Sequence, residues 1–219
     1  MPKVYEFDGV RPVVHPGAYV HPSAVLIGDV IIGPRCFIGP AACLRGDFGR
    51  IILEEGANFQ DTCVVHGVSE QDTVVEANGH IGHGVVLHGC RIGRNALVGM
   101  NSVILDRAVV GEESLVAAMS LVKGGQIVAP RSLMSGSPAT LVRVLREDEI
   151  HWKGEGNSEY QRLAEVCLRS MREVEAYTEI EPDRKRAGFA LAAQERLMAR
   201  RMQSTIPADA ADAAARRST

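Results

Sequence analysis

The sequence has few aromatic residues, with five Phe, four Tyr and a single Trp among 219 residues. A core built almost without large rings is filled by small aliphatic side chains. Glycine is plentiful instead, at 22 residues, and it tolerates the tight turns that most residues avoid. The composition therefore favours thin aliphatic layers separated by many corners.

The sequence also lacks an excess of basic residues and a long apolar run. Its 24 Lys and Arg are outweighed by 27 Asp and Glu, which gives no concentrated positive surface for the phosphates of a nucleic acid. No apolar run approaches the roughly 20 residues that span a bilayer. The first residues carry Glu6, Asp8 and Arg11 where a signal peptide needs an apolar centre. We expect a cytoplasmic protein with neither a nucleic-acid nor a membrane partner.

Paired cysteines are missing as well. The five cysteines form no C-x-x-C motif, so the sequence suggests neither a disulfide framework nor a thiolate zinc site. We expect reduced structural thiols.

Aliphatic residues recur at every sixth position in two phases. The first phase comprises Val20, Leu26, Ile32, Ile38 and Leu44, and the second comprises Val86, Ile92, Val98, Ile104, Val110, Val116 and Val122. Small residues recur with the same period in the second phase, at Cys90, Ala96, Ser102, Ala108, Ser114 and Ser120. Short strands joined by tight turns produce this period, whereas a helix of 3.6 residues per turn does not. The pattern predicts a mostly β protein, a parallel β-helix with about 18 residues per triangular coil and five to six coils between Val20 and Val122.

The rest of the chain is arranged around this repeat. We expect an N-terminal lead-in at 1–19, the β-helix with a metal site at 20–140, a C-terminal helical segment at 141–206 and a disordered tail at 207–219. Polar residues interrupt the repeat, and a loop is predicted across Gly67 to Thr73.

A C-terminal helix is predicted to begin near Ser158, where Ser158-x-x-Gln161 matches a capping box. Its apolar face is predicted to comprise Tyr160, Leu163, Cys167, Met171 and Val174. A second helix is predicted from about Ala187 to Met202.

Three of the seven histidines are candidates for metal binding, because neutral imidazole is a common metal ligand. His83 and His88 are five residues apart, so they fall on adjacent faces of one coil. His66 and His88 are separated by one coil plus a short loop, and they can stack on one face. This geometry requires a second subunit, so that His83 of one chain meets His66 and His88 of its neighbour in a homotrimer. Spacing alone leaves a second interpretation open, in which backbone carbonyls satisfy these histidines. We expect His80 to lie behind a ligand or at the surface.

Several motifs add to the hexads. They are Arg45-Gly46-Asp47, Asn58-Phe59-Gln60-Asp61, His66 and His83-x-x-x-x-His88. Together they resemble the gamma-class carbonic anhydrases, and from Tyr5 to about Arg186 the chain is most similar to the subgroup with the phenylacetic-acid-degradation and carnitine-operon proteins. The resemblance implies a left-handed coil.

The resemblance also implies a metal site. His66, His83 and His88 match the ligands of a metal ion, usually zinc, with iron or cobalt as alternatives. Arg45 and Asp47 match a pair that bridges subunits, either as a structural ion pair or to orient substrate.

Two further matches concern the surroundings of the metal. Gln60 matches a residue that bonds the metal-bound water, and Asp61 matches a carboxylate behind a ligand. Phe48 stands where the founding anhydrases have a glutamate, and the segment between His66 and His83 lacks their long acidic loop with its proton-shuttling glutamate. Because CO₂ hydration returns a proton to solvent in each turnover, these departures weigh against a fast anhydrase.

The resulting functional prediction is a metal-dependent hydrolase. We expect an acyl-CoA thioesterase that attacks ring-containing CoA thioesters of phenylacetate degradation with a metal-bound hydroxide. The alternatives are a carbonic anhydrase, a hexapeptide acyltransferase that uses a general-base histidine without a metal, and a non-catalytic trimeric scaffold.

Overall fold

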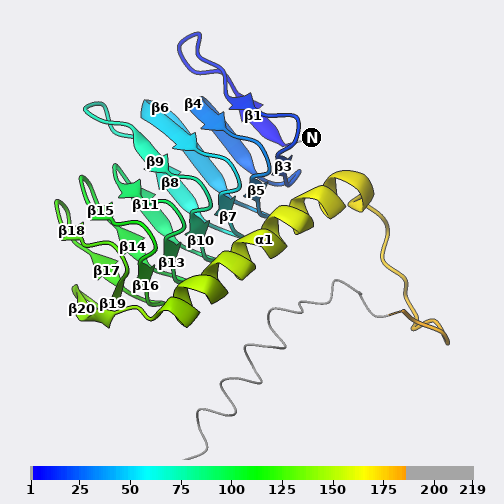
Figure 1. Cartoon of the computed structure of the whole chain (residues 1–219). Coiled ribbons are helices and arrows are strands. Elements are labelled where there is room, and N and C mark those ends of the chain that lie inside the picture. Colours follow the sequence, from blue (N-terminus) through cyan, green and yellow to red (C-terminus); the bar gives the residue numbers. More distant parts are fainter. Residues whose placement is uncertain (1, 186–219) are drawn as a thin grey trace, which may run out of the picture. The chain divides into compact units, whose positions relative to one another are not determined.

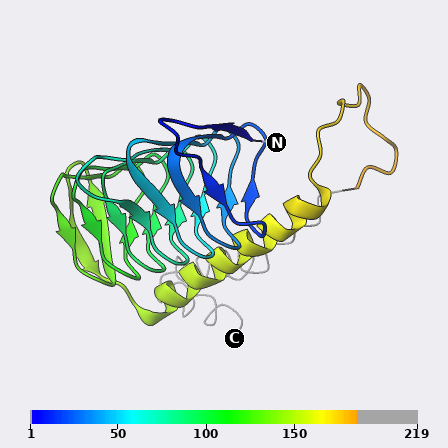
Figure 2. The same cartoon turned by 90° about the horizontal axis from the view of Figure 1, so that it is seen from above.

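The computed structural model describes residues 2–185. The chain divides into two compact units, one up to Arg172 and one from Glu173. The first unit is a parallel β-solenoid with one helix, α1 (Glu147–Ser170), running along it (Figures 1 and 2). The predicted mostly β fold with stacked hexapeptide coils is confirmed. No helix within residues 2–185 has the length and apolar character needed to cross a membrane.

The strands are short and follow one another around the coils. They are β1 (Lys3–Tyr5), β2 (Val13–Val14), β3 (Tyr19–Val20), β4 (Val25–Ile32), β5 (Phe37–Ile38), β6 (Cys43–Leu53), β7 (Asn58–Phe59), β8 (Val64–His66), β9 (Thr73–Val75), β10 (His80–Ile81), β11 (Val86–His88), β12 (Arg91–Ile92), β13 (Leu97–Val98), β14 (Val103–Ile104), β15 (Val109–Val110), β16 (Leu115–Val116), β17 (Leu121–Val122), β18 (Ile127–Val128), β19 (Ser132–Gly136) and β20 (Ala139–Val144).

One sheet contributes a single strand to each coil, in the order β3-β5-β7-β10-β13-β16-β19, which gives about seven coils. The antiparallel strand β20 closes this sheet. The other two faces form one continuous sheet, because the long strand β6 pairs with both β8 and β9. The stack begins before the predicted residue 20, and within the predicted range of 20–140 the coils continue beyond Val122. Strands β1 and β2 of the expected lead-in already pair with β4, and β18 and β19 continue beyond Val122.

The inward aliphatic positions form the core as predicted except at Val86, although Val20 in the first coil is only partly buried against it. From Ile92 to Val122 each predicted second-phase residue is fully buried. Val86 is 37% exposed, and its neighbour Leu87 is buried in its place. Leu87 pairs in register with Val65 and Ile104, so the core position in β11 is one residue later than the regular period indicates. The irregular step follows β11, because the buried residues Leu87 and Ile92 are five residues apart, whereas Ile81 and Leu87 keep the regular six.

The small residues at the corners have a polar role as well as a steric one. The Cys36 thiol donates to the main-chain oxygen of Glu54 at 3.0 Å, and the Ser102 hydroxyl donates to that of Ala117 at 3.0 Å. Cysteine and serine thereby join successive coils through the same kind of contact. Burial raises the pKa of the Cys36 thiol to about 12, and all five cysteines are free, as expected for structural thiols.

Helix α1 begins at Glu147, well before the predicted start near Ser158. The Glu149 carboxylate accepts the Arg146 backbone N–H at 2.9 Å, so the capping interaction forms at this earlier position. The Ser158 hydroxyl instead donates to the Gly154 carbonyl inside the helix. The helix ends at Ser170.

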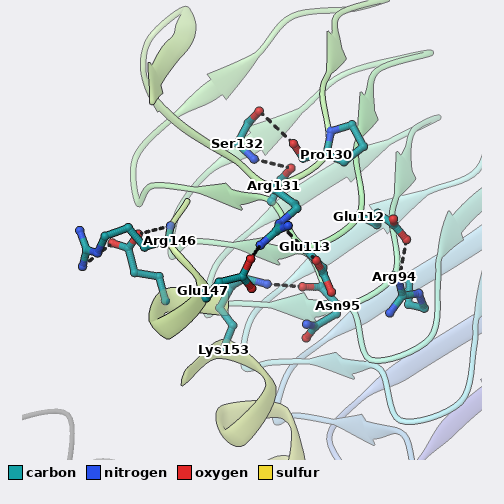
Figure 3. Close-up of polar contacts among 12 residues, drawn as sticks. Arg94, Asn95, Glu112, Glu113, Pro130, Arg131, Ser132, Arg146, Glu147 and Lys153 are labelled. Carbon is teal, nitrogen blue, oxygen red and sulfur yellow. Dashed lines mark hydrogen bonds and ion pairs between the residues drawn. The ribbon is translucent and has the colours of Figure 1, made fainter. Parts of the chain in front are cut away.

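Three polar side chains spaced four residues apart attach the helix to the corners of the solenoid. The Lys153 ammonium donates to the Asn95 main-chain oxygen, as Figure 3 shows, and the Asn157 amide donates to the Asn78 oxygen at 2.5 Å. The Gln161 amide reaches the preceding coil, where it donates to the Gly56 main-chain oxygen at 3.5 Å, and it also donates to the Asn78 side-chain oxygen at 2.8 Å. Four residues extend a helix by about 6 Å, and successive coils are about 4.8 Å apart. A helix placed obliquely across the stack therefore meets a new coil about every four residues.

An apolar cluster secures the other end of the helix. Tyr160, Leu163 and Cys167 pack with Ala164 against Tyr19 and Phe37 of the first coils. This part of the predicted apolar face is confirmed, whereas Met171 and Val174 lie beyond the helix end and are exposed. The second predicted helix, from about Ala187, and the predicted disordered tail at 207–219 lie outside the described residues.

Candidate metal centre

His66 and His88 are stacked on the outward side of neighbouring strands. They end β8 and β11 and are partners in the parallel register. The side chains of Val65 and Leu87 point into the core, so the alternation along each strand turns the histidines outward. The His66 Nδ1 and His88 Nε2 atoms are 3.1 Å apart. The predicted stacking on one face is present.

A carboxylate holds the outer nitrogen of each of these two rings. Asp47 lies 3.0 Å from His66 Nε2, and Asp106 lies 2.6 Å from His88 Nδ1. Arg45 contacts the other Asp47 oxygen at 2.7 Å. Burial alone would raise the pKa of Asp47, but the hydrogen bonds from Arg45 and His66 outweigh it and hold the pKa below its usual value. Within one chain, Arg45 and Asp47 pair with each other.

His83 lies apart from this pair. Its Nδ1 atom is 2.6 Å from Asp61, and the His83 side chain is 46% exposed. Within the part of the chain that the structure describes, no three His, Cys, Asp or Glu side chains are grouped to hold a metal ion. A single subunit therefore presents the His66 and His88 pair and, separately, His83 with its carboxylate.

Gln60 and His80 lie under helix α1. The Gln60 amide is buried and contacts both the Asn58 side-chain oxygen at 2.9 Å and His80 Nε2 at 2.8 Å. His80 Nδ1 contacts Asn157 of the helix at 3.0 Å. Burial lowers the pKa of His80 to about 4. His80 is thus partly buried beneath helix α1, where it contacts Gln60, and it does not lie on the open surface.

The three histidines suit a zinc ion by the chemistry of their surroundings. A carboxylate on one ring nitrogen fixes the tautomer and leaves the other nitrogen with its lone pair, which is the usual arrangement behind metal-binding histidines. Two nitrogens on one tetrahedral zinc ion, each about 2.0–2.1 Å from it, are about 3.3 Å apart. The 3.1 Å separation between the inner nitrogens of His66 and His88 is close to this value.

An exposed aromatic ring stands beside the histidine pair. Phe48 is 66% exposed, and its ring centroid is 5.2 Å from that of His66. The predicted loop is confirmed and follows His66 directly, between β8 and β9. A Cβ on Gly49 would lie 1.9 Å from the Val68 oxygen, so only glycine lets this loop pack so closely. A cavity of about 220 Å³ lies between the loop and Asp106.

Asp106 is the one residue of this cluster that the sequence motifs do not include. It lies 18 residues after His88, which is the length of one coil, and coil stacking brings it beside the ring. The spacing of one coil between a histidine and a carboxylate is the signal that identifies it.

Comparisons with known proteins agree with the fold. Residues 11–46 and 89–124 match the family model described as bacterial transferase hexapeptide (six repeats). The carnitine operon protein CaiE of Citrobacter koseri is 59% identical over 182 residues, covering 83% of this chain and 92% of that protein. This chain belongs to the hexapeptide-repeat family of the carnitine operon proteins. The resemblance to the carnitine-operon subgroup is thereby confirmed.

Two solved structures extend the comparison. A hexapeptide transferase family protein from Anaplasma phagocytophilum is 40% identical, with a TM-score of 0.72 over 75% of this chain and 97% of that one. A Bacillus cereus protein assigned as an acetyltransferase is 29% identical, with a TM-score of 0.75 over 76% of this chain and 97% of that one. This hexapeptide-repeat family therefore includes proteins linked to acyl transfer.

Proposed function

We propose that the protein is a metal-dependent acyl-CoA thioesterase that acts as a homotrimer. His66 and His88 of one subunit and His83 of its neighbour would hold the metal, with zinc as the expected ion. The proposal rests above all on one observation: each of the three imidazoles has a carboxylate within 2.6–3.0 Å of one nitrogen. The other nitrogen of each ring is then available as a ligand.

The outward face beside the histidine pair supports the trimer. An apolar row runs in register across β6, β8, β11, β14 and β17, parallel to the row of Arg45, His66 and His88. It comprises Cys43, Val64, Val86, Val103 and Leu121. Val64 and Val86 are 40% and 37% exposed in the single chain. A second copy that covers this row would bring its own His83 towards the pair and complete a site that one chain lacks.

A zinc ion bound by three imidazoles supplies a water of lowered pKa and an electrophile for a carbonyl oxygen. Residues of the chain itself would position the ligands and the substrate. Asp47 holds His66 in place, and Arg45 in turn holds Asp47. Phe48 offers an apolar surface next to the histidines, which suits the ring of an aryl acyl group better than CO₂.

A direct assay tests the proposal. The zinc-loaded or iron-loaded protein is incubated with phenylacetyl-CoA and other aryl-CoA thioesters, and the released CoA thiol is measured. His88→Ala is the matched control because it removes one ligand and leaves the solenoid core unchanged. CoA release that does not exceed this control rules out the thioesterase. Measuring CO₂ hydration on the same samples tests the carbonic anhydrase alternative.

Acyl transfer is the second candidate, and the comparisons favour it. The matching family model is described as a transferase, and the Bacillus cereus relative is assigned as an acetyltransferase. An acyltransferase of this kind needs an acceptor but no metal. One bound metal ion per subunit, lost in His83→Ala, supports the hydrolase. Full acyl transfer by the metal-free protein supports the transferase.

A further inference from the structure

Asp106 determines which nitrogen of His88 faces His66. The Asp106 Oδ1 atom is 2.6 Å from His88 Nδ1, and a carboxylate accepts a hydrogen bond there only if Nδ1 carries the proton. His88 Nε2 then keeps its lone pair and points at His66 Nδ1, 3.1 Å away.

The same arrangement occurs on the other side of the pair. Asp47 accepts the Nε2 proton of His66 at 3.0 Å, so His66 Nδ1 also keeps its lone pair. With the outer nitrogens protonated, the inner nitrogens of the two rings face one another across 3.1 Å, an arrangement that attracts a metal ion or a shared proton between them. Loss of either carboxylate lets one ring turn its proton inward.

The backbone of Asp106 is fixed by both neighbouring coils. Its own carbonyl accepts the Gly125 N–H at 2.8 Å, and the next residue, Arg107, donates its N–H to Gly89. Gly89 has a positive φ of 51°, and a Cβ there would lie 2.8 Å from Asp106 Oδ1. The solenoid therefore leaves space for this carboxylate and holds it against His88.

From this geometry we propose that Asp106 is a positioning residue of the metal centre. It acts through His88, whose tautomer and orientation it sets, and it does not touch the substrate. This role rests on the proposed metal site, but the tautomer itself is a property of the metal-free protein. Asp106 would complete a set in which every histidine ligand has its own carboxylate, with Asp47 behind His66 and Asp61 behind His83.

The test compares Asp106→Ala and Asp106→Asn with Asp72→Asn, which changes an exposed carboxylate of the neighbouring loop. Zinc affinity is measured by competition with a chromophoric chelator. Removing such an outer carboxylate typically lowers metal affinity about 10–100-fold. We expect a loss of this size for Asp106→Ala, a smaller loss for Asp106→Asn and none for Asp72→Asn. The urea unfolding midpoint of each metal-free variant shows whether the solenoid is intact.

A second readout needs no metal. Nitrogen-15 NMR of the histidine rings in the metal-free wild type should show His88 protonated at Nδ1, and Asp106→Ala should shift the proton towards Nε2. Wild-type zinc affinity together with an unchanged His88 tautomer in Asp106→Ala would overturn the proposal. A wild-type protein that binds no zinc would refute the proposed function, and the tautomer measurement would then still decide whether Asp106 positions His88.

Discussion

The Asn157 side-chain amide donates to the main-chain oxygen of Asn78 at 2.5 Å and so joins the middle of helix α1 to a corner of the solenoid. The Asn157 oxygen also contacts Asn58 and His80 at 3.3 and 3.0 Å. One side chain of the helix thus satisfies several polar groups on the face that it covers.

Replacement of Asn157 by alanine should destabilise the protein. It leaves the Asn78 carbonyl and the Asn58 amide under the helix without this partner, and an unsatisfied buried polar group costs about 1–3 kcal/mol. Urea unfolding at fixed protein concentration measures the effect. Ser158→Ala, at an exposed position of the same helix, should change stability by less than about 0.5 kcal/mol. Equal effects of the two substitutions would contradict the role given to Asn157.

Lowering the pH should reduce the folding stability of the protein, in part through protonation of His80. Its pKa is about 4 in the folded protein and close to 6.5 once the protein unfolds. Between these values the unfolded state binds a proton that the folded state does not, so stability falls as pH decreases from about 6.5 to 4.

His80→Gln should remove this part of the pH dependence. The loss of unfolding free energy between pH 6.5 and 4 should be smaller than in wild type, by on the order of 1–3 kcal/mol. The exposed His151→Gln serves as the control. The expectation is wrong if wild type and His80→Gln lose stability equally over this range.

Mixing of two inactive variants should restore metal sites if the sites lie between subunits. His83→Ala and His88→Ala damage opposite halves of a site. In a random mixture about three-quarters of the trimers contain both variants, and each mixed trimer has one intact site of three. The metal content should therefore recover to about one quarter of the wild-type value. A mixture of His66→Ala and His88→Ala damages the same half and should recover nothing. Equal metal content in the two mixtures would exclude the intersubunit site.

Replacement of Phe48 by alanine should change substrate preference. If its exposed ring contacts the acyl group, kcat/KM for a phenylacetyl thioester should fall about 10-fold or more, while the value for acetyl-CoA changes little. The ratio of the two values is the measurement. Phe7→Ala, at another exposed ring near the N-terminus, is the control. An unchanged ratio for Phe48→Ala would show that this ring does not contribute to substrate recognition.

The repeat was predictable from the sequence because one physical constraint governs every coil. A large inward side chain and a small corner residue recur at six-residue intervals, so period alone locates Leu44 or Ile104 in the core. The stacking of His66 on His88 followed from the same constraint. The six-residue period fails at Val86, because Leu87 and Ile92 are only five residues apart and the core position in β11 is therefore Leu87.

The helix was harder to place because its buried face is largely polar. Lys153 and Asn157 are buried, but in the sequence they have the character of exposed helix residues. Gly154 and Gly156 further obscure a helix that begins at Glu147. The acidic first turn, Glu147, Asp148 and Glu149, was the available signal for its N-terminus. Asp106 was missed because its partner lies a full coil away.

The path of helix α1 has a consequence for how the protein unfolds. Coils of a solenoid contact only their neighbours, so such a stack tends to lose coils progressively from its ends. Helix α1 runs along the stack from its last coils to its first, as Figure 2 shows. It contacts Arg131 of the last coils through Glu147 and packs against Tyr19 and Phe37 of the first, so one element joins both ends. Fraying of either end must then break contacts along the helix, which makes unfolding more cooperative. During synthesis, the face of the first coils that helix α1 covers therefore stays exposed until residues near Tyr160 have been made.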